Sequence, residues 1–269
     1  MQNHLTLALL ATIVTAPALR AETIPAPGDL IRAELLPGWR EADGRHFAAL
    51  HLRLAPQWKT YWRAPGDAGI PPQFDWSGSE NLGRVTVHWP RPTVFDFEGM
   101  TTIGYLQDVV LPVEVEPQDP SRPMHLQARV DLGICKDVCV PAEVSMEGAL
   151  PTPGAADAAI AAALAARPLD STTGGIEMAD CSVAEISDGL QVTARLRLPP
   201  GPAAETVVME PGAPVWVSDS TVNRDGNLLT AVADMVPGPG QSFTLDPAAL
   251  RLTVLSGSHA VELIGCPLR

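Results

Sequence analysis

Two runs of strictly alternating apolar and polar residues flank the segment "CKDVC" at residues 135–139. The apolar positions are Ala128, Val130, Leu132 and Ile134 before the segment, and Val140, Ala142, Val144 and Met146 after it. A period of two indicates β-strands with one buried face. Folding the runs about residues 136–138 pairs Ile134 with Val140, Leu132 with Ala142 and Val130 with Val144, so the apolar faces coincide. The sequence therefore predicts a long β-hairpin.

The same register places Cys135 directly opposite Cys139, on the less apolar face of the hairpin. Cross-strand Cβ atoms lie roughly 4.5 to 5.5 Å apart, and a relaxed disulfide prefers roughly 3.8 Å. We therefore expect a disulfide that forms but is strained, and that is easily reduced. We also expect both sulfur atoms to be reachable by a partner protein.

The rest of the chain is organised in the same way. Alternating segments at residues 48–54, 85–89 and 109–115 are separated by turn clusters, and the chain of 269 residues contains 27 prolines and 22 glycines. This pattern predicts a β-sandwich over residues 22–150. Residues 151–170 are rich in alanine and predict a helical linker. Alternation resumes over residues 171–269, which predicts a second, smaller β-sandwich domain in an all-β protein.

The N-terminal segment has the layout of a secretory signal. An apolar stretch from Leu5 to Val14 is followed by small residues and Pro17, and cleavage fits best after Ala21. We therefore expect residues 1–21 to be a signal peptide that directs the protein to the periplasm. Beyond it no stretch is long and apolar enough for stable membrane insertion.

Charge excludes two further classes of partner. The chain has 18 Lys and Arg residues against 31 Asp and Glu residues, for a formal net charge of −13. Nucleic acid and anionic lipid surfaces are therefore poor partners.

Four cysteines allow three sets of disulfide pairings, but the spacing of the cysteines indicates different roles for the Cys181–Cys266 and Cys135–Cys139 pairs. A Cys181–Cys266 bond would close a loop of roughly 85 residues and stabilise by about 4 to 5 kcal/mol, whereas Cys135–Cys139 would contribute about 2 kcal/mol. The long bridge is a sensible structural disulfide for the second domain. The short pair fits a reversible dithiol, a structural hairpin bridge or a Cu(I) clip. Two sulfurs are too few for a closed zinc site, and we expect no metal or cofactor.

Three segments together indicate a family. The stretches "WKTYWRAPGDAGIPPQFDW", "WPRPTVFDFEGMTTIGYLQDVVLPVEV" and "CKDVCVPAE" resemble the periplasmic N-terminal domain of the disulfide reductase DsbD, especially its ScsB-like subgroup. The resemblance covers roughly residues 30–150. It implies an immunoglobulin-like fold and a thiol-disulfide oxidoreductase that relays reducing equivalents to oxidised periplasmic proteins. Its implied partners are thioredoxin-like periplasmic proteins and a membrane thiol transporter of the DsbD/CcdA type. The alternative is a non-catalytic binding module for Cu(I) or a partner protein.

The resemblance also assigns roles to individual residues. It makes Cys139 the cysteine that forms mixed disulfides and Cys135 the resolving cysteine. A cap loop that gates the disulfide corresponds to Asp96, Phe97, Glu98 and Gly99, with the ring of Phe97 over the sulfur atoms. Tyr61 and Trp62 correspond to aromatic residues beside the active pair.

Overall fold

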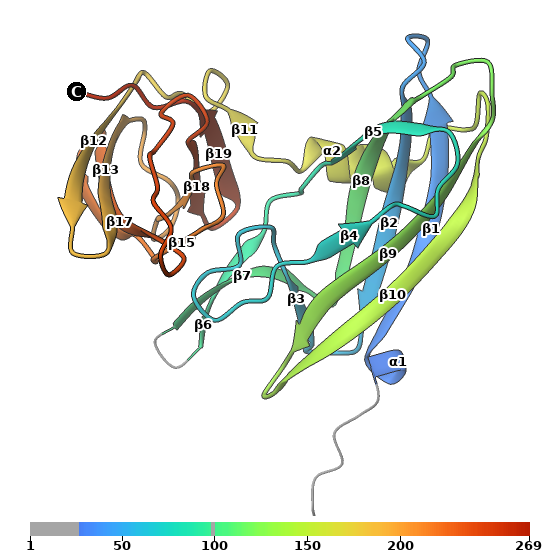
Figure 1. The fold of residues 1–269 in the computed structure, drawn as a ribbon, viewed down its shortest axis with the longest axis horizontal. Helices are drawn as coiled ribbons and strands as arrows, with labels where there is room; N and C mark the ends of the chain where they lie inside the picture. The colour runs from blue at the N-terminus through green and yellow to red at the C-terminus, as the bar shows by residue number, and fades with distance from the viewer. Residues whose placement is uncertain (1–26, 98–99) are drawn as a thin grey trace, which may run out of the picture.

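The computed structural model describes residues 27–97 and 100–269. Figure 1 shows two separate β-structures joined by a short helical connection. The predicted signal peptide, residues 1–21, lies outside the described residues. Among the helices of the described part, none is long and apolar enough to cross a membrane.

The first unit begins with a single helical turn and continues as ten strands. These elements are α1 (Pro27–Leu30), β1 (Ile31–Arg40), β2 (His46–Leu54), β3 (Lys59–Tyr61), β4 (Gln73–Asp75), β5 (Leu82–Val87), β6 (Thr93–Phe97), β7 (Met100–Leu106), β8 (Asp108–Pro117), β9 (Met124–Cys135) and β10 (Cys139–Leu150). One sheet has the order β1-β2-β8-β5. The other has the order β10-β9-β3-β7-β6, and β4 pairs with β9 outside this path.

The core of the first sandwich lies between these two sheets. Every second residue of β2, β8 and β9 is buried there, as the alternating pattern predicts. Members of this core include Leu50, Leu52, Leu111, Val113, Leu126, Val130, Leu132 and Ile134, none of which is more than 3% exposed. This burial fixes the register of β9 and β10, because a shift by one residue would turn every apolar side chain toward solvent.

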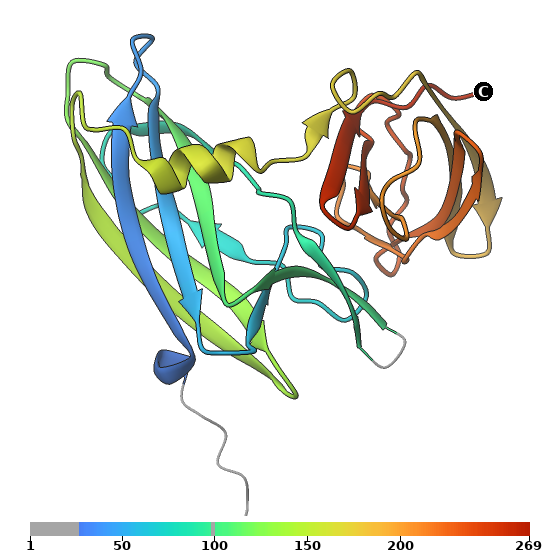
Figure 2. The same ribbon diagram turned by 180° about the vertical axis from the view of Figure 1, so that it is seen from behind.

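Helix α2 (Ala158–Ala165) connects the two sandwiches. Asp157 caps its N-terminus by accepting hydrogen bonds from the backbone N–H groups of Ala159 and Ile160. Ile160 is fully buried, and the helix packs on β8 and β2 of the first sandwich, as Figure 2 shows. The helix occupies eight residues of the Ala-rich segment at 151–170, and the flanking residues are extended or turn structure.

The second unit contains the remaining nine strands. These are β11 (Leu169–Asp170), β12 (Met178–Ile186), β13 (Gly189–Arg197), β14 (Thr206–Glu210), β15 (Val215–Val217), β16 (Thr221–Asp225), β17 (Leu228–Pro237), β18 (Arg251–Ser256) and β19 (His259–Ile264). The sheets have the orders β11-β19-β18-β14 and β12-β13-β17-β15, with β16 also paired to β17. A second core forms between them, with Leu196, Leu229, Met235, Leu250 and Leu252 at its centre.

The all-β fold class is confirmed: an immunoglobulin-like sandwich is followed by a helical linker and a second β-sandwich. The two cores are not fully independent. Leu255 and Ala260 of the second sandwich are buried in the core cluster of the first. The second sandwich is therefore in direct apolar contact with the unit that carries the "CKDVC" segment.

Candidate functional site

The site lies at the end of the β9–β10 hairpin. The two strands pair without interruption from Leu150–Met124 to Cys139–Cys135, and the three predicted apolar pairs are all present. Cys135 and Cys139 form a disulfide, and their Cα atoms are 4.2 Å apart. The predicted register and pairing are therefore confirmed.

The two sulfur-bearing residues differ in exposure. Cys139 is exposed, whereas Cys135 is only 2% exposed. The expectation that both sulfur atoms are reachable is therefore wrong for Cys135. The reason lies in the sheet order. β10 is the outer strand, whereas β9 also pairs with β3, which places Lys59 next to Cys135 and Tyr61 against its sulfur atom.

Tyr61 lies against both sulfur atoms. Its hydroxyl donates a hydrogen bond to Cys135 Sγ at 2.8 Å and lies 3.4 Å from Cys139 Sγ. The side chain is 2% exposed, and burial raises the pKa of Tyr61 above its ordinary value. The phenol therefore keeps its proton at neutral pH and stays a hydrogen-bond donor to the buried sulfur.

Two glycines make room for the ring of Tyr61. A Cβ atom on Gly133 would lie 2.9 Å from Ile70 Cβ and 3.1 Å from Tyr61 Cε2, and one on Gly69 would lie 2.9 Å from Tyr61 Cδ1. The ring thus fits between β9 and the loop that carries Gly69 and Ile70. Sequence reasoning missed both glycines and Ile70. The available signal was a glycine inside an apolar strand, which often marks a close approach.

Trp62 points away from the disulfide. Its side chain is fully buried in the core of the first sandwich, and the guanidinium of Arg63 lies 4.2 Å from the centre of its ring. Successive residues of an extended chain face opposite sides, so Tyr61 and Trp62 do not both reach the sulfur atoms. Of the two predicted site aromatics, Tyr61 contacts the disulfide and Trp62 is a core residue.

The first two residues of the predicted cap loop lie at the end of β6. Asp96 and Phe97 lie in β6, where they pair with Thr101 and Met100, and Glu98 and Gly99 lie outside the described residues. Cys135 pairs with Lys59 of β3, and Lys59 in turn pairs with Leu106 of β7, so these residues form one rung of the sheet. Leu106 is the last residue of β7, and Met100, the partner of Phe97, is the first. Asp96 and Phe97 are therefore not on the rung of the cysteines. Closure of Phe97 over the disulfide stays a prediction.

Lys59 connects the cysteine rung to the β6–β7 hairpin. Its Nζ donates a hydrogen bond to Thr102 Oγ1 at 2.8 Å and lies 5.0 Å from the centre of the Phe95 ring. Burial lowers the pKa of Lys59. Strand β3 thus contributes the Tyr61 phenol to the site, and its Lys59 links the site to the β6–β7 hairpin.

The second disulfide joins Cys181 to Cys266 across a sequence separation of 85. Both residues are buried in the core of the second sandwich, at 0% and 1% exposure. The bond ties β12 to the segment after β19, where Cys181 also exchanges backbone hydrogen bonds with Pro267 and Arg269. In the described part of the chain, no three His, Cys, Asp or Glu side chains come together as a set of metal ligands.

Comparisons with known proteins address the same region. Residues 32–151 match the profile of the family described as "Thiol:disulfide interchange protein DsbD, N-terminal". The N-terminal periplasmic domain of ScsB from Proteus mirabilis superimposes with a TM-score of 0.67 at 24% sequence identity, over 91% of this chain and 97% of that one. The C-terminal domain of the Streptococcus agalactiae AgI/II polypeptide BspA gives a TM-score of 0.19 at 7% identity, over 86% of this chain and 98% of that one, and carries no argument. A search of curated proteins gave no match.

The ScsB structure supports the fold of both sandwiches, because it covers nearly the whole of this chain. The family match covers the sandwich that carries the Cys135–Cys139 disulfide. Residues 32–151 therefore form a domain that belongs to the DsbD N-terminal family of thiol:disulfide interchange proteins.

Proposed function

We propose that the protein is a periplasmic thiol-disulfide oxidoreductase that relays reducing equivalents through Cys135 and Cys139. The observation that carries the proposal is the asymmetry of the disulfide. One sulfur belongs to an exposed residue at the sheet edge, and the other belongs to a buried residue that accepts a hydrogen bond from Tyr61. Such an arrangement favours attack at Cys139 and departure of Cys135.

The first half of the cycle reduces the protein. A thiolate of a dithiol donor attacks Cys139 Sγ, the Cys135–Cys139 bond breaks, and Cys135 leaves as a thiolate. The Tyr61 hydroxyl, 2.8 Å from Cys135 Sγ, stabilises the charge that develops on this sulfur. The second thiol of the donor then attacks its own sulfur in the mixed disulfide and releases Cys139. Two electrons and two protons pass from the donor to the protein.

The second half reduces a substrate disulfide. The Cys139 thiolate attacks one substrate sulfur and forms a mixed disulfide, while the other substrate sulfur leaves as a thiolate. Cys135 then attacks Cys139 Sγ, re-forms the intramolecular disulfide and releases the substrate as a dithiol. Each bond that forms replaces one that breaks, so the chain needs no cofactor of its own for this cycle.

The surface near Cys139 suits contact with another protein. Val138 lies beside Cys139 in the hairpin turn, Ile70 packs toward Gly133, and Leu106 lies on the rung that includes Cys135. The exposed fractions of Val138, Ile70 and Leu106 are 48%, 43% and 49%. Apolar residues at this exposure favour docking of a partner. We propose thioredoxin-like periplasmic proteins and a membrane thiol transporter as donors and acceptors, in line with the family.

Trapping of the intermediate tests the proposal. A Cys135→Ala variant should accumulate mixed disulfides through Cys139 in the periplasm, whereas a Cys139→Ala variant should not, because Cys135 is buried. The intact Cys181–Cys266 bond serves as an internal control, since it should stay oxidised in both variants. The proposal fails if Cys135→Ala traps no partner, or if the Cys135–Cys139 pair has a reduction potential below about −300 mV, which is typical of inert structural disulfides.

A further inference from the structure

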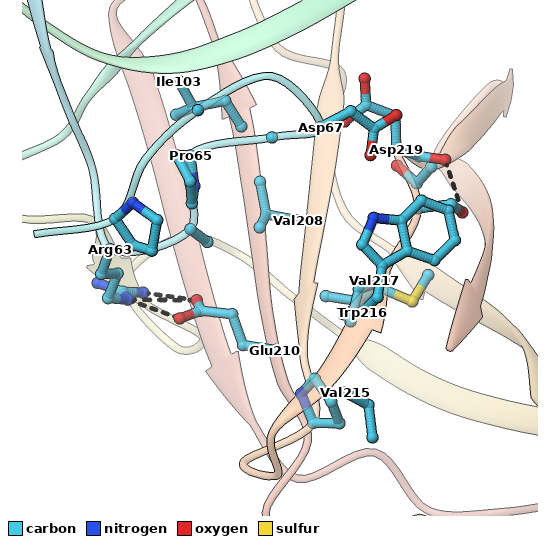
Figure 3. A pocket seen from close by; sticks show the side chains of 18 of the residues that line it. Arg63, Pro65, Asp67, Ile103, Val208, Glu210, Val215, Trp216, Val217 and Asp219 are labelled. Carbon is cyan, nitrogen blue, oxygen red and sulfur yellow. Dashed lines mark hydrogen bonds and ion pairs between the residues drawn. The ribbon is translucent and has the colours of Figure 1, made fainter. Parts of the chain in front are cut away.

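A cleft of about 570 Å³ lies between the two sandwiches. One wall is the loop at residues 63–71 that follows β3, together with Ile103. The other wall is β14, β15 and the bend at residues 218–220 between β15 and β16. Figure 3 shows this cleft with Arg63 and Glu210 at one end, and Asp67 and Asp219 at the other.

The positive charge in the cleft is already neutralised. The Arg63 guanidinium donates hydrogen bonds to Glu210 at 2.9 and 3.0 Å and also binds Glu262. Arg251 supplies a second cation to Glu262. This end of the cleft is therefore an internal ion-pair network that holds the two sandwiches together.

The negative charge at the opposite end is not neutralised. Asp67 and Asp219 approach from the two walls, and neither forms a salt bridge with any cation in the described part of the chain. The pKa of Asp67 is raised by burial and, to a smaller extent, by the charge of Asp219, while a hydrogen bond from the Asp219 backbone to the Asp67 carboxylate partly offsets this rise. An occupant that brings a cation to this point would relieve the repulsion between the two carboxylates.

Trp216 stands beside these carboxylates. It is 54% exposed, and its indole ring lies next to Asp219 in Figure 3. The wall between the charged ends is apolar, with Pro65, Val208 and Val217 as lining residues. An open indole face attracts Lys or Arg side chains and also covers their aliphatic stems.

The cleft also lies where two sheets end. In the sheets that the structure describes, β14 is the last strand of one order and β15 the last strand of the other. Edge strands present backbone N–H and C=O groups that an extended peptide can pair with. Ser220 Oγ donates to the Val207 C=O and so holds the two edges together at one point. These backbone groups favour a polypeptide over a free small molecule.

We propose that this cleft binds an extended segment of a partner protein in which a Lys or Arg side chain is flanked by apolar residues. The cation would lie between Asp67 and Asp219 against the Trp216 ring, and the apolar neighbours would pack on Pro65 and Val217. The proposal gives the second sandwich a role, since it supplies one whole wall. It does not depend on the proposed thiol exchange.

Peptide binding to the full exported protein tests this proposal. The probe is a fluorescein-labelled, blocked heptapeptide of alternating valine and lysine, and the matched probe has glutamate in place of lysine. Fluorescence anisotropy should show saturable binding of the lysine peptide alone. Binding should weaken about tenfold in Trp216→Ala and in the double variant Asp67→Asn/Asp219→Asn. Asp188→Asn removes an exposed carboxylate at the β12–β13 turn and should leave binding unchanged.

Three results would overturn the proposal. The first is binding of the lysine and glutamate peptides with equal affinity, or no binding of either peptide. The second is binding of N-acetyl-lysine methylamide as tightly as the peptide, because the backbone contacts would then contribute nothing. The third is self-association of the protein that Trp216→Ala abolishes, because a second copy would then be the occupant. Thiol-exchange rates of the same variants should match those of the unmodified protein, which separates this test from that of the proposed oxidoreductase.

Discussion

The hydrogen bond from Tyr61 to Cys135 Sγ gives a quantitative prediction for Tyr61→Phe. A hydrogen bond contributes about 0.5 to 1.5 kcal/mol to a neutral acceptor and about 1.5 to 3 kcal/mol to a charged one. As the disulfide breaks, Cys135 Sγ gains negative charge, so the bond should strengthen by roughly 1 to 1.5 kcal/mol. Without the hydroxyl, reduction of the Cys135–Cys139 disulfide should therefore slow roughly five- to twelvefold.

Stopped-flow reduction by dithiothreitol measures this effect without the complication of partner docking. The chain offers a matched control, because its only other tyrosine, Tyr105, is also buried and donates a hydrogen bond at 2.7 Å to the Pro90 carbonyl, away from the sulfur atoms. Tyr105→Phe should be reduced at the unmodified rate. The reasoning is refuted if Tyr61→Phe is reduced as fast as the unmodified protein, or if both variants slow equally.

Three further predictions concern stability and the shape of the site. Gly133→Ala should slow thiol exchange and lower stability by about 1 to 3 kcal/mol, because the added Cβ would lie 2.9 Å from Ile70 Cβ and 3.1 Å from the Tyr61 ring. Gly148→Ala should do neither, since its Cβ would meet only the flexible end of the Leu35 side chain. Removal of the Cys181–Cys266 bond should lower the stability of the second sandwich by about 4 to 5 kcal/mol in urea unfolding while the first domain still exchanges thiols. Burial lowers the pKa of His46 below 6.5, so the unfolded chain gains its proton first as the pH falls. Stability should therefore drop as the pH decreases below about 6.5, and this drop should be smaller in His46→Gln.

The β9–β10 hairpin could be predicted in detail because its alternation is strict on both strands. The observed register places the apolar residues of both strands on one face, and a shift by one residue would move those of the shifted strand to the opposite face. The position of Cys135 opposite Cys139 follows from that register alone. The Cys181–Cys266 pairing was also predictable, because it is the one pairing that remains among the four cysteines once the short pair is assigned.

The unequal burial of the two cysteines could not be predicted in the same way. It depends on which strand of the hairpin is covered by β3, and β3 lies more than 70 residues earlier in the chain. The opposite orientations of Tyr61 and Trp62 also required the sheet, since either residue could have faced the sulfur atoms. The interdomain cleft had no signal in the sequence, because its two walls come from separate sandwiches.

The unbroken ladder between β9 and β10 determines what happens after the sulfur-sulfur bond opens. The strands remain paired from Leu150–Met124 up to the rung of the cysteines, so both thiols stay at neighbouring positions in the reduced protein. In the proposed cycle we therefore expect little backbone rearrangement between the two redox states and a small entropic cost for re-forming the disulfide. Under that proposal the hairpin would allow repeated opening and closing of the bond without refolding of the strands.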